Sequence, residues 1–245
     1  MEWRSSPPTL TLPMDEVQIW RANLQANPDA IETYCWLLSP DEQERANRFH
    51  FQKDRNRYVM ARGILRVILS RYLHRLPQDL QFRYSPTGKP SLAHPSDSPL
   101  CFNLSHSGQL ALYAVAWHRE VGIDVEHIRL ERDCEHIAER FFAASEQADL
   151  NQLSPKLRHQ GFFNGWTRKE AFLKATGQGL TIPLDQIVVS LLPKEPAQIL
   201  HTVWNPAEVT RWSIQALEVG NEYAAAVVAA GQDWQIVTWQ FKRLC

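Results

Sequence analysis

The same order of predicted elements occurs twice along this chain of 245 residues. In the first half, the helix-start pattern Ser39-Pro40-Asp41-Glu42 precedes a predicted long helix over about Lys53–His74, and strands follow. In the second half, Ser145-Glu146-Gln147 precedes a predicted helix over Arg158–Thr176, and strands follow again. We therefore predict an α+β fold, built as a pseudo-twofold tandem of two similar α+β halves.

The junction of the two halves is expected near residues 118–122, which divides the chain into residues 1–119 and residues 120–245. The proline-rich residues 1–14 are expected to be irregular, and Gly177 is expected to cap the second long helix. Two further helices are predicted over Asp133–Phe142 and Ser145–Leu153. Strands are predicted at Ile31–Leu38, Gln81–Tyr84, Phe102–Leu104, Ala111–Trp117, Val121–Glu126, Ile187–Leu191, Arg211–Leu217, Tyr223–Ala229 and Gln235–Phe241, with a turn at Ser105–Gly108. An interface between two such halves is a preferred place for a ligand cleft.

Composition excludes several classes of protein. Hydrophobic residues make up 44% and charged residues 22% of the chain, which is typical of globular proteins and excludes a disordered chain. The apolar run Ala224–Ala230 is far shorter than the ~18–20 residues that span a bilayer. The first residues lack the layout of a signal peptide, so a cytoplasmic location is expected. The four cysteines are far apart, which predicts reduced thiols: Cys35, Cys101, Cys134 and Cys245.

Charge is unevenly distributed, although the net charge is only −1. This balance gives no reason to expect nucleic acid or an anionic membrane as a partner. The segment from Arg45 to Arg75 nevertheless carries nine basic residues and one acid, Asp54. Residues 1–119 hold 14 basic and 11 acidic residues, whereas residues 120–245 hold 12 and 16. One end of the molecule is therefore expected to attract polyanions and the other to hold cations, although a solvated basic helix face would also explain the basic run.

Two carboxylates on one predicted strand are the first candidates for chemistry. Asp124 and Glu126 are two residues apart, so both point to one face of the strand Val121–Glu126. Adjacent carboxylates repel each other unless a cation lies between them. Gly122 permits a close backbone approach beside them, which favours a site. The alternative is a polar strand face exposed to water.

A third carboxylate lies on the second long helix. Glu170 shares a helix face with Trp166 and Lys174, at spacings of four residues. An ordinary Glu–Lys helical pair would explain this pattern. If Glu170 instead meets Asp124 and Glu126, the three oxygen ligands suit Mg²⁺, which commonly shares itself with substrate phosphates.

Two short motifs add groups that can bind phosphate. The small, hydroxyl-rich segment Ser105-His106-Ser107-Gly108 is better suited to receiving a phosphate than to hydrolysis, because no nucleophile elbow accompanies it. Gly88-Lys89-Pro90 is no Walker loop, yet its lysine can pair with a phosphate. Together with the acids and the basic helix, these motifs predict a substrate that carries a polyphosphate.

Four blocks in this order resemble the Sfp-type 4′-phosphopantetheinyl transferases, and the resemblance extends over about residues 30–230. The blocks are Gly88–Pro90, Phe102–Ser107, Val121–Glu126 and Trp166–Lys174. The resemblance implies a fold of two α+β halves and transfer of the phosphopantetheine arm of coenzyme A to a serine of an acyl, peptidyl or aryl carrier protein. It also implies Mg²⁺ or Mn²⁺ as the cofactor, with adenosine 3′,5′-bisphosphate as the second product. A chain that contains its own pseudo-dimer is expected to act as a monomer.

The resemblance implies a role for each matching residue. Asp124, Glu126 and Glu170 match the metal-site acids, and Glu170 is also a candidate base for the carrier serine. The residues that match coenzyme A contacts are Arg45, Arg57, Lys89, Ser105, His106 and Lys174, with His106 mainly at the 3′-phosphate and Lys174 also at the departing phosphate. The acid Glu42 stands where some relatives carry lysine, and this departure leaves the roles of Arg48, Arg55 and Arg62 open.

Two other classes of function compete with the transferase. A Mg²⁺-dependent nucleotide phosphohydrolase would use the same acids and cations, but it does not explain the four ordered blocks. A catalytically inactive module that binds coenzyme A or a carrier need not keep Asp124, Glu126 and Glu170. Because carrier proteins are acidic helical bundles, arginines within residues 45–75 and the apolar residues near Phe141-Phe142 are candidates for the carrier-docking surface.

Overall fold

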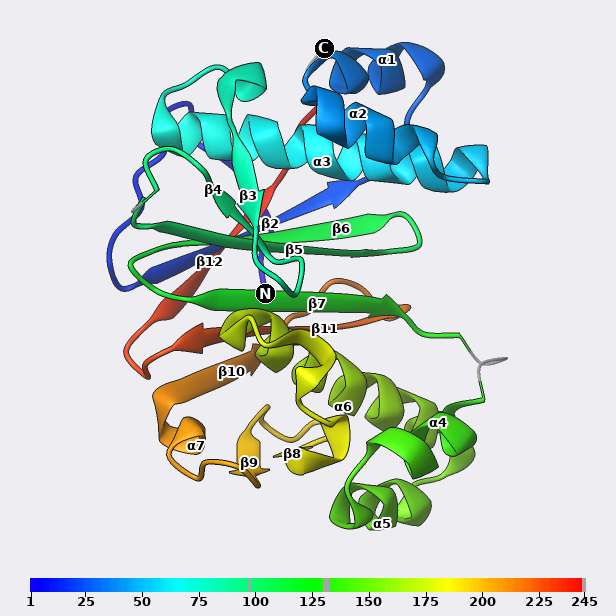
Figure 1. The fold of residues 1–245 in the computed structure, drawn as a ribbon. Helices are drawn as coiled ribbons and strands as arrows, with labels where there is room; N and C mark the ends of the chain where they lie inside the picture. The colour runs from blue at the N-terminus through cyan, green and yellow to red at the C-terminus, as the bar shows by residue number, and fades with distance from the viewer. Residues whose placement is uncertain (97, 130–132, 244–245) are drawn as a thin grey trace.

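Two β-sheets pack face to face between two layers of helices (Figure 1). The computed structural model describes residues 1–96, 98–129 and 133–243. The first half contains β1 Arg4–Ser5, β2 Glu16–Asn23, α1 Pro28–Trp36, α2 Pro40–Asn47, α3 Gln52–Leu73, the 3₁₀ turn η1 Pro77–Asp79, β3 Phe82–Tyr84, β4 Pro90–Leu92, β5 Leu100–Ser107 and β6 Leu110–Trp117. The second half contains β7 Val121–His127, α4 Cys134–Phe141, α5 Ala144–Gln152, α6 Pro155–Thr176, η2 Gly179–Thr181, η3 Leu184–Gln186, β8 Ile187–Val189, β9 Ile199–Thr202, α7 Glu208–Arg211, β10 Trp212–Ala216, β11 Tyr223–Ala230 and β12 Gln235–Gln240.

The two halves repeat one topology, which confirms the predicted pseudo-twofold α+β tandem. In each half a strand precedes three helices, the third of which has 22 residues. A two-stranded sheet and then an antiparallel hairpin follow. The order β2-β6-β5 in the first sheet matches the order β7-β11-β10 in the second. Two strands and one α-helix of the described residues depart from this symmetry. Strand β12 lies parallel to β2 in the first sheet, β1 lies parallel to β12, and helix α7 between β9 and β10 has no counterpart between β4 and β5.

The apolar faces of the two sheets form the centre of the molecule. Val121, Ile123 and Val125 of β7 pack with Val17 and Ile19 of β2 in one buried cluster. The outer face of the first sheet packs against α1 and α3, and the outer face of the second packs against α6. The alternation predicted for Val121–Glu126 is therefore confirmed, since its polar members face away from this central cluster toward α6.

A buried carboxylate joins the short and long helices of each half in the same way. Glu42 lies near the start of α2, accepts a bond from the backbone of Ser39 at 3.1 Å and pairs with Arg66 of α3 at 2.7 Å. Glu146 lies near the start of α5, accepts a bond from the backbone of Ala143 at 2.8 Å and pairs with Lys169 of α6 at 2.7 Å. Each cation also donates to carbonyls of the segment that leads into the next short strand, η1 or η3. The repeat therefore extends to individual buried polar contacts.

Several predicted boundaries are wrong. Residues 31–38, predicted as a strand, belong mostly to helix α1, which Asn27 caps and Pro28 begins. Strand β2 was not predicted, and β1 lies within the segment expected to be irregular. The predicted turn at Ser105–Gly108 is displaced, because β5 continues to Ser107.

The remaining sequence-based expectations concern membranes and cysteines. Within the described ranges, no helix is long and apolar enough to cross a membrane. Cys35, Cys101 and Cys134 are free, and Cys245 lies outside the described residues.

Candidate active site

The two halves meet where β5 lies beside β7, and side chains rather than a backbone ladder join these strands. The backbone N–H of Ile123 donates to Asn103 Oδ1 at 3.0 Å, and that of His127 donates to Ser107 Oγ at 3.0 Å. Asn103 and Ser107 are both buried. The polar residues of the Phe102–Ser107 block therefore hold β7 in place.

The hydroxyls of this seam also orient the two acids of β7. Ser105 Oγ donates to Asp124 Oδ1 at 2.8 Å, and Ser107 Oγ donates to Glu126 Oε2 at 2.9 Å. Asp124 is only 4% exposed. A buried carboxylate is costly unless it is paired, so these contacts and the one from α6 explain how Asp124 is tolerated here.

Helix α6 brings Lys174 to the same carboxylate. Its Nζ lies 2.7 Å from Asp124 Oδ1 and 3.0 Å from Ser105 Oγ. The helix can approach this closely because Gly122 has no side chain: a Cβ there would lie 2.1 Å from the carbonyl oxygen of Ala171. The close approach predicted for Gly122 is thus confirmed, and Lys174 pairs across the site rather than only along its own helix.

Glu170 completes a group of three neighbouring carboxylates. Burial raises the pKa of Glu170, and the charges of Asp124 and Glu126 raise it further, whereas Lys174 opposes the shift. The carboxyl is therefore easier to protonate than an ordinary glutamate, which is a property of a group that takes up a proton during a reaction.

The donor set of this site fits a divalent cation in its chemistry. Asp124 Oδ2 is buried and has no hydrogen-bond partner within the described part of the chain. Such an oxygen beside two further carboxylates suits a hard cation such as Mg²⁺. The fit is incomplete, because the described residues contain no group of three or more His, Cys, Asp or Glu arranged to hold a metal. The expected metal set Asp124, Glu126 and Glu170 is thus near one place but not gathered as three ligands.

Two adjoining pockets open beside these acids. The first is lined by Lys89, Asn103, Glu170 and Lys174, among others. The second is lined by Arg45, Ser105, His106 and Lys174, and it also includes Phe49, Tyr58, Arg62 and Tyr84. We call the second one the basic pocket. Lys174 borders both, so the pockets form one surface that runs from the acids of the second half to the basic helices of the first.

The electrostatics of the basic pocket favour an anion. Desolvation by the surrounding protein lowers the pKa of His106, and the positive charges of Lys174 and Arg57 lower it further. A bound phosphate would counteract that effect and favour the protonated ring. Arg57 does not border the pocket; it bonds to Asp54 at 3.3 Å and acts on His106 through its charge.

Lys89 is placed less directly than expected. Its Nζ bonds to Glu120 Oε2 and to the carbonyl oxygen of Ala175, both at 2.9 Å, while its side chain borders the first pocket. Thr87 Oγ1 donates to the carbonyl oxygen of Gly177 at 2.7 Å. The β3–β4 hairpin of the first half is therefore fastened to the end of α6, and a phosphate contact by Lys89 stays a prediction.

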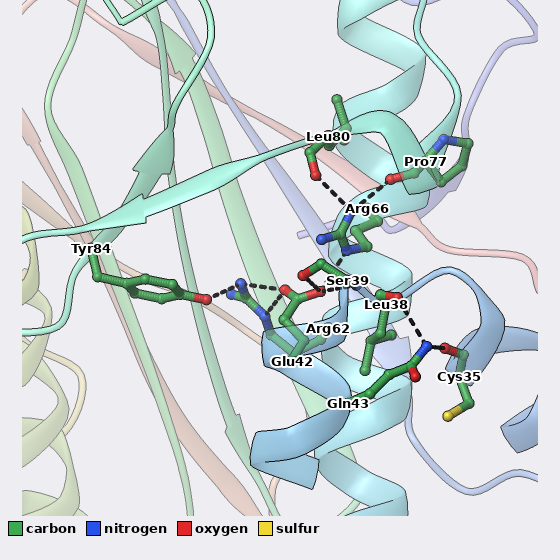
Figure 2. Close-up of polar contacts among 10 residues, drawn as sticks. All are labelled: Cys35, Leu38, Ser39, Glu42, Gln43, Arg62, Arg66, Pro77, Leu80 and Tyr84. Atoms are coloured by element: carbon green, nitrogen blue, oxygen red, sulfur yellow. Dashed lines mark hydrogen bonds and ion pairs between the residues drawn. The ribbon is translucent and has the colours of Figure 1, made fainter.

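Glu42, which stands where some relatives carry lysine, lies behind the pocket rather than in it. It is 1% exposed and accepts bonds from Arg62 at 2.8 Å and from Arg66 at 2.7 Å, as Figure 2 shows. Sequence reasoning missed three aromatic residues of the pocket wall, Phe49, Tyr58 and Tyr84. Tyr58 Oη is buried without a hydrogen-bond partner in the described structure, and burial raises the pKa of Tyr58 to about 12.

Comparison with known proteins supplies independent information. Residues 20–118 match the family model "4′-phosphopantetheinyl transferase, N-terminal", and residues 120–228 match "4′-phosphopantetheinyl transferase superfamily". The 4′-phosphopantetheinyl transferase HetI of Nostoc sp. is 43% identical over 240 residues, 98% of each chain. A putative 4′-phosphopantetheinyl transferase of Synechocystis sp. is 37% identical over 71% of this chain and 70% of its own length. Sfp of Bacillus subtilis is 31% identical over 83% of this chain and 87% of its own length.

Proposed function

Because this chain belongs to the 4′-phosphopantetheinyl transferase family, we propose that it moves the 4′-phosphopantetheine arm of coenzyme A to a serine of an apo carrier protein, with release of adenosine 3′,5′-bisphosphate. The observation that supports the location of this reaction is the position of Lys174, which pairs with the buried Asp124 and lines both pockets, the first of them together with Glu170. The basic pocket provides the cations that a substrate with three phosphates needs.

Glu170 is proposed as the base. Its raised pKa makes it a better proton acceptor than an ordinary glutamate, and it borders the first pocket, where a carrier serine would enter. The serine oxygen then attacks the β-phosphorus of coenzyme A, and the bond from that phosphorus to the bridging oxygen breaks. The released pair of electrons stays on the departing adenosine bisphosphate.

Lys174 is proposed to stabilise the charge that develops on the departing phosphate. Asp124 and Ser105 hold its ammonium group at 2.7 and 3.0 Å, so it is positioned before the substrate binds. Arg45 and His106 are proposed to bind the phosphates at the adenosine end, with Arg57 adding long-range charge and Ser105 and Lys89 at the edges.

We propose that Asp124, Glu126 and Glu170 hold Mg²⁺ or Mn²⁺ when coenzyme A is present. The unpartnered Asp124 Oδ2 supports this assignment. A bound divalent ion would neutralise negative charge on the pyrophosphate. The three acids would also repel one another less, which agrees with the direction of the Glu170 pKa shift.

A mass measurement tests the function. The protein is incubated with coenzyme A, Mg²⁺ and several apo carriers from fatty-acid, polyketide and peptide synthesis. We expect the intact mass of at least one carrier to rise by that of one phosphopantetheine group, and no change in a carrier whose serine is replaced by alanine. Loss of transfer with a chelator, and in Asp124→Asn, is expected from the proposed site.

The alternatives give different results in the same assay. A nucleotide phosphohydrolase would consume coenzyme A and leave every carrier unmodified, and an inactive binding module would consume nothing. Full transfer by Asp124→Asn would refute the proposed metal site. The expectation of a cytoplasmic monomer belongs to this proposal, and light scattering of the purified protein checks the monomer.

A further inference from the structure

Arg62 is a buried arginine that the proposed reaction does not yet use. Its side chain is 6% exposed and donates from Nε to Glu42 Oε1 at 2.8 Å, and its Nη2 lies 2.6 Å from the same oxygen in an ion pair. The same Nη2 lies 2.7 Å from the hydroxyl oxygen of Tyr84, to which it donates. Figure 2 shows the guanidinium lying between the carboxylate on one side and the tyrosine on the other.

The second half of the molecule shows that the fold does not require this arginine. Glu146 corresponds to Glu42, and its Oε1 accepts a hydrogen bond from the backbone N–H of Val189 at 2.9 Å, where Oε1 of Glu42 is bound by Arg62. Arg62 precedes Arg66 by four residues, and the residue four before Lys169 is Gly165. The second half thus joins α5 to α6 through Glu146 and one cation, whereas the first half joins α2 to α3 through Glu42 and two cations. The second of these, Arg62, lines the basic pocket.

Arg62 donates its bond on the pocket side to Tyr84. Tyr84 ends β3, pairs with Pro90 across the β3–β4 hairpin and is 40% exposed. Its ring borders the basic pocket together with Arg45 and His106. The centre of the ring lies 5.8 Å from the carbon of the Arg62 guanidinium. Tyr84 is therefore an exposed aromatic residue on a short hairpin, held from behind by a buried charge.

We infer that Tyr84 contacts coenzyme A in the basic pocket and that Arg62, itself held by Glu42, is the residue that positions Tyr84. The inference rests on the proposed function, because it names a further contact within the same substrate site. The tyrosine hydroxyl accepts its bond from a charged donor, which polarises the O–H group and leaves the hydrogen for an acceptor on the ligand. Phosphate oxygens are such acceptors.

The experiment measures steady-state transfer by Tyr84→Phe, Arg62→Met and the double variant, with saturating carrier and varied coenzyme A. Each single substitution is expected to raise the KM for coenzyme A about tenfold, the effect of one lost hydrogen bond that involves a charged group, and to leave kcat within about twofold. Because both residues act through one contact, the double variant is expected to equal the single variants rather than their product. Calorimetric titration of coenzyme A, without carrier, is expected to show the same pattern in Kd.

Two further variants separate positioning from a structural role. Tyr72→Phe on α3 also removes a hydroxyl, one that accepts a hydrogen bond from Trp20 Nε1 and donates one to Gln18 Oε1. Tyr72 lies in the core away from the pocket, so lower stability with an unchanged KM is expected. Arg62→Lys keeps a positive charge beside Glu42, so it replaces Arg62→Met in the cycle if the latter unfolds. Lysine lacks the guanidinium group that contacts Glu42 and Tyr84 at the same time, so the same rise in KM is expected.

Three results would overturn the inference. The first is an unchanged KM and Kd for coenzyme A in Tyr84→Phe. The second is a double variant whose KM rises by the product of the single effects. Either of them, with normal transfer by the unchanged protein, overturns the role of these residues alone. The third is an unchanged protein that modifies no carrier, which would overturn the proposed function and this inference together.

Discussion

The glycine at the crossing of β7 and α6 provides a sharp test of how the site is assembled. A Cβ on Gly122 would lie 2.1 Å from the carbonyl oxygen of Ala171 and 2.2 Å from the backbone nitrogen of Ala175. Ordinary van der Waals contact begins at 3.4 Å. Gly122→Ala must therefore separate the strand from the helix by about 1.3 Å, the difference between 3.4 and 2.1 Å. Both obstacles are backbone atoms, so no side chain can move aside to relieve the clash.

This separation acts directly on the reacting groups. Asp124 lies on the strand, two residues from the glycine, whereas Glu170 and Lys174 lie on the helix. The contact of 2.7 Å between Lys174 and Asp124 would be lost. A displacement of about 1 Å in a catalytic group can reduce a rate by about 10²-fold, so we expect that loss in kcat/KM. Overpacking is expected to lower the free energy of unfolding by about 1–3 kcal/mol.

The assay compares Gly122→Ala on strand β7 with Gly161→Ala on helix α6. The atoms nearest to a Cβ on Gly161 are the ends of three leucine side chains, those of Leu153 at 2.9 Å, Leu150 at 3.1 Å and Leu191 at 3.6 Å, and these can rotate. Carrier modification and urea unfolding are measured for both variants. We expect Gly161→Ala to retain normal kcat/KM. Normal activity and an unchanged unfolding midpoint in Gly122→Ala would refute the reasoning.

Three further predictions concern charge. Because the pKa of Glu170 is raised, the folded state binds its proton more tightly than the unfolded state, and the associated stability is lost as pH rises through the raised pKa. Glu170→Gln should therefore abolish transfer. Without divalent ions at pH 7 it should nevertheless have a higher melting temperature than the unsubstituted protein, and this gain should vanish below about pH 4. A lower melting temperature at pH 7 would contradict the prediction. Glu146→Gln leaves the fully buried Lys169 without its negatively charged partner, so urea denaturation should show a loss of about 3–5 kcal/mol in the free energy of unfolding. A loss below about 1 kcal/mol would show that the ion pair is dispensable. The Arg48 side chain is 72% exposed, and Arg48→Glu should raise the KM for an acidic carrier at low salt. The rise should be smaller at high salt, and the KM for coenzyme A should not change. A rise that does not depend on salt would reject electrostatic docking at Arg48.

A strand whose two faces meet different surroundings could be predicted from the sequence, whereas a strand with both faces in the apolar core could not. Strand β7 alternates because its apolar face meets the other sheet and its polar face meets α6. In β2, the consecutive residues Val17, Gln18, Ile19 and Trp20 are all buried, so their sequence lacks a period of two. The internal repeat predicts β2, because a strand that corresponds to β7 should precede the helices of the first half.

The wrong strand at residues 31–38 has a similar physical explanation. A run of apolar residues there favours a strand, but the buried residues Tyr34 and Leu38 are four positions apart, which is a helical spacing. The preceding Asn27-Pro28-Asp29 is the same kind of helix start as Ser39-Pro40-Asp41. Pattern and cap together would have identified α1.

The candidate site was predictable in its acids but not in its buried partners. Residue type and spacing made Asp124, Glu126 and Glu170 candidates, and the four ordered blocks joined them into one predicted site. They did not show that Glu42 holds Arg62, because that pairing depends on how α2 crosses α3. They also did not show that Lys89 bonds to Glu120, which depends on how the hairpin crosses between halves.

The place of β12 has a consequence for how the protein forms. This strand follows every element of the second half, yet it lies between β1 and β2 of the first sheet. Until β12 has been synthesised, one side of β2 presents unpaired backbone groups to its surroundings, a known route to edge-to-edge aggregation. The half that emerges first from the ribosome is therefore completed last, and truncation or splitting of the chain before Gln235 should produce a fragment that associates with itself.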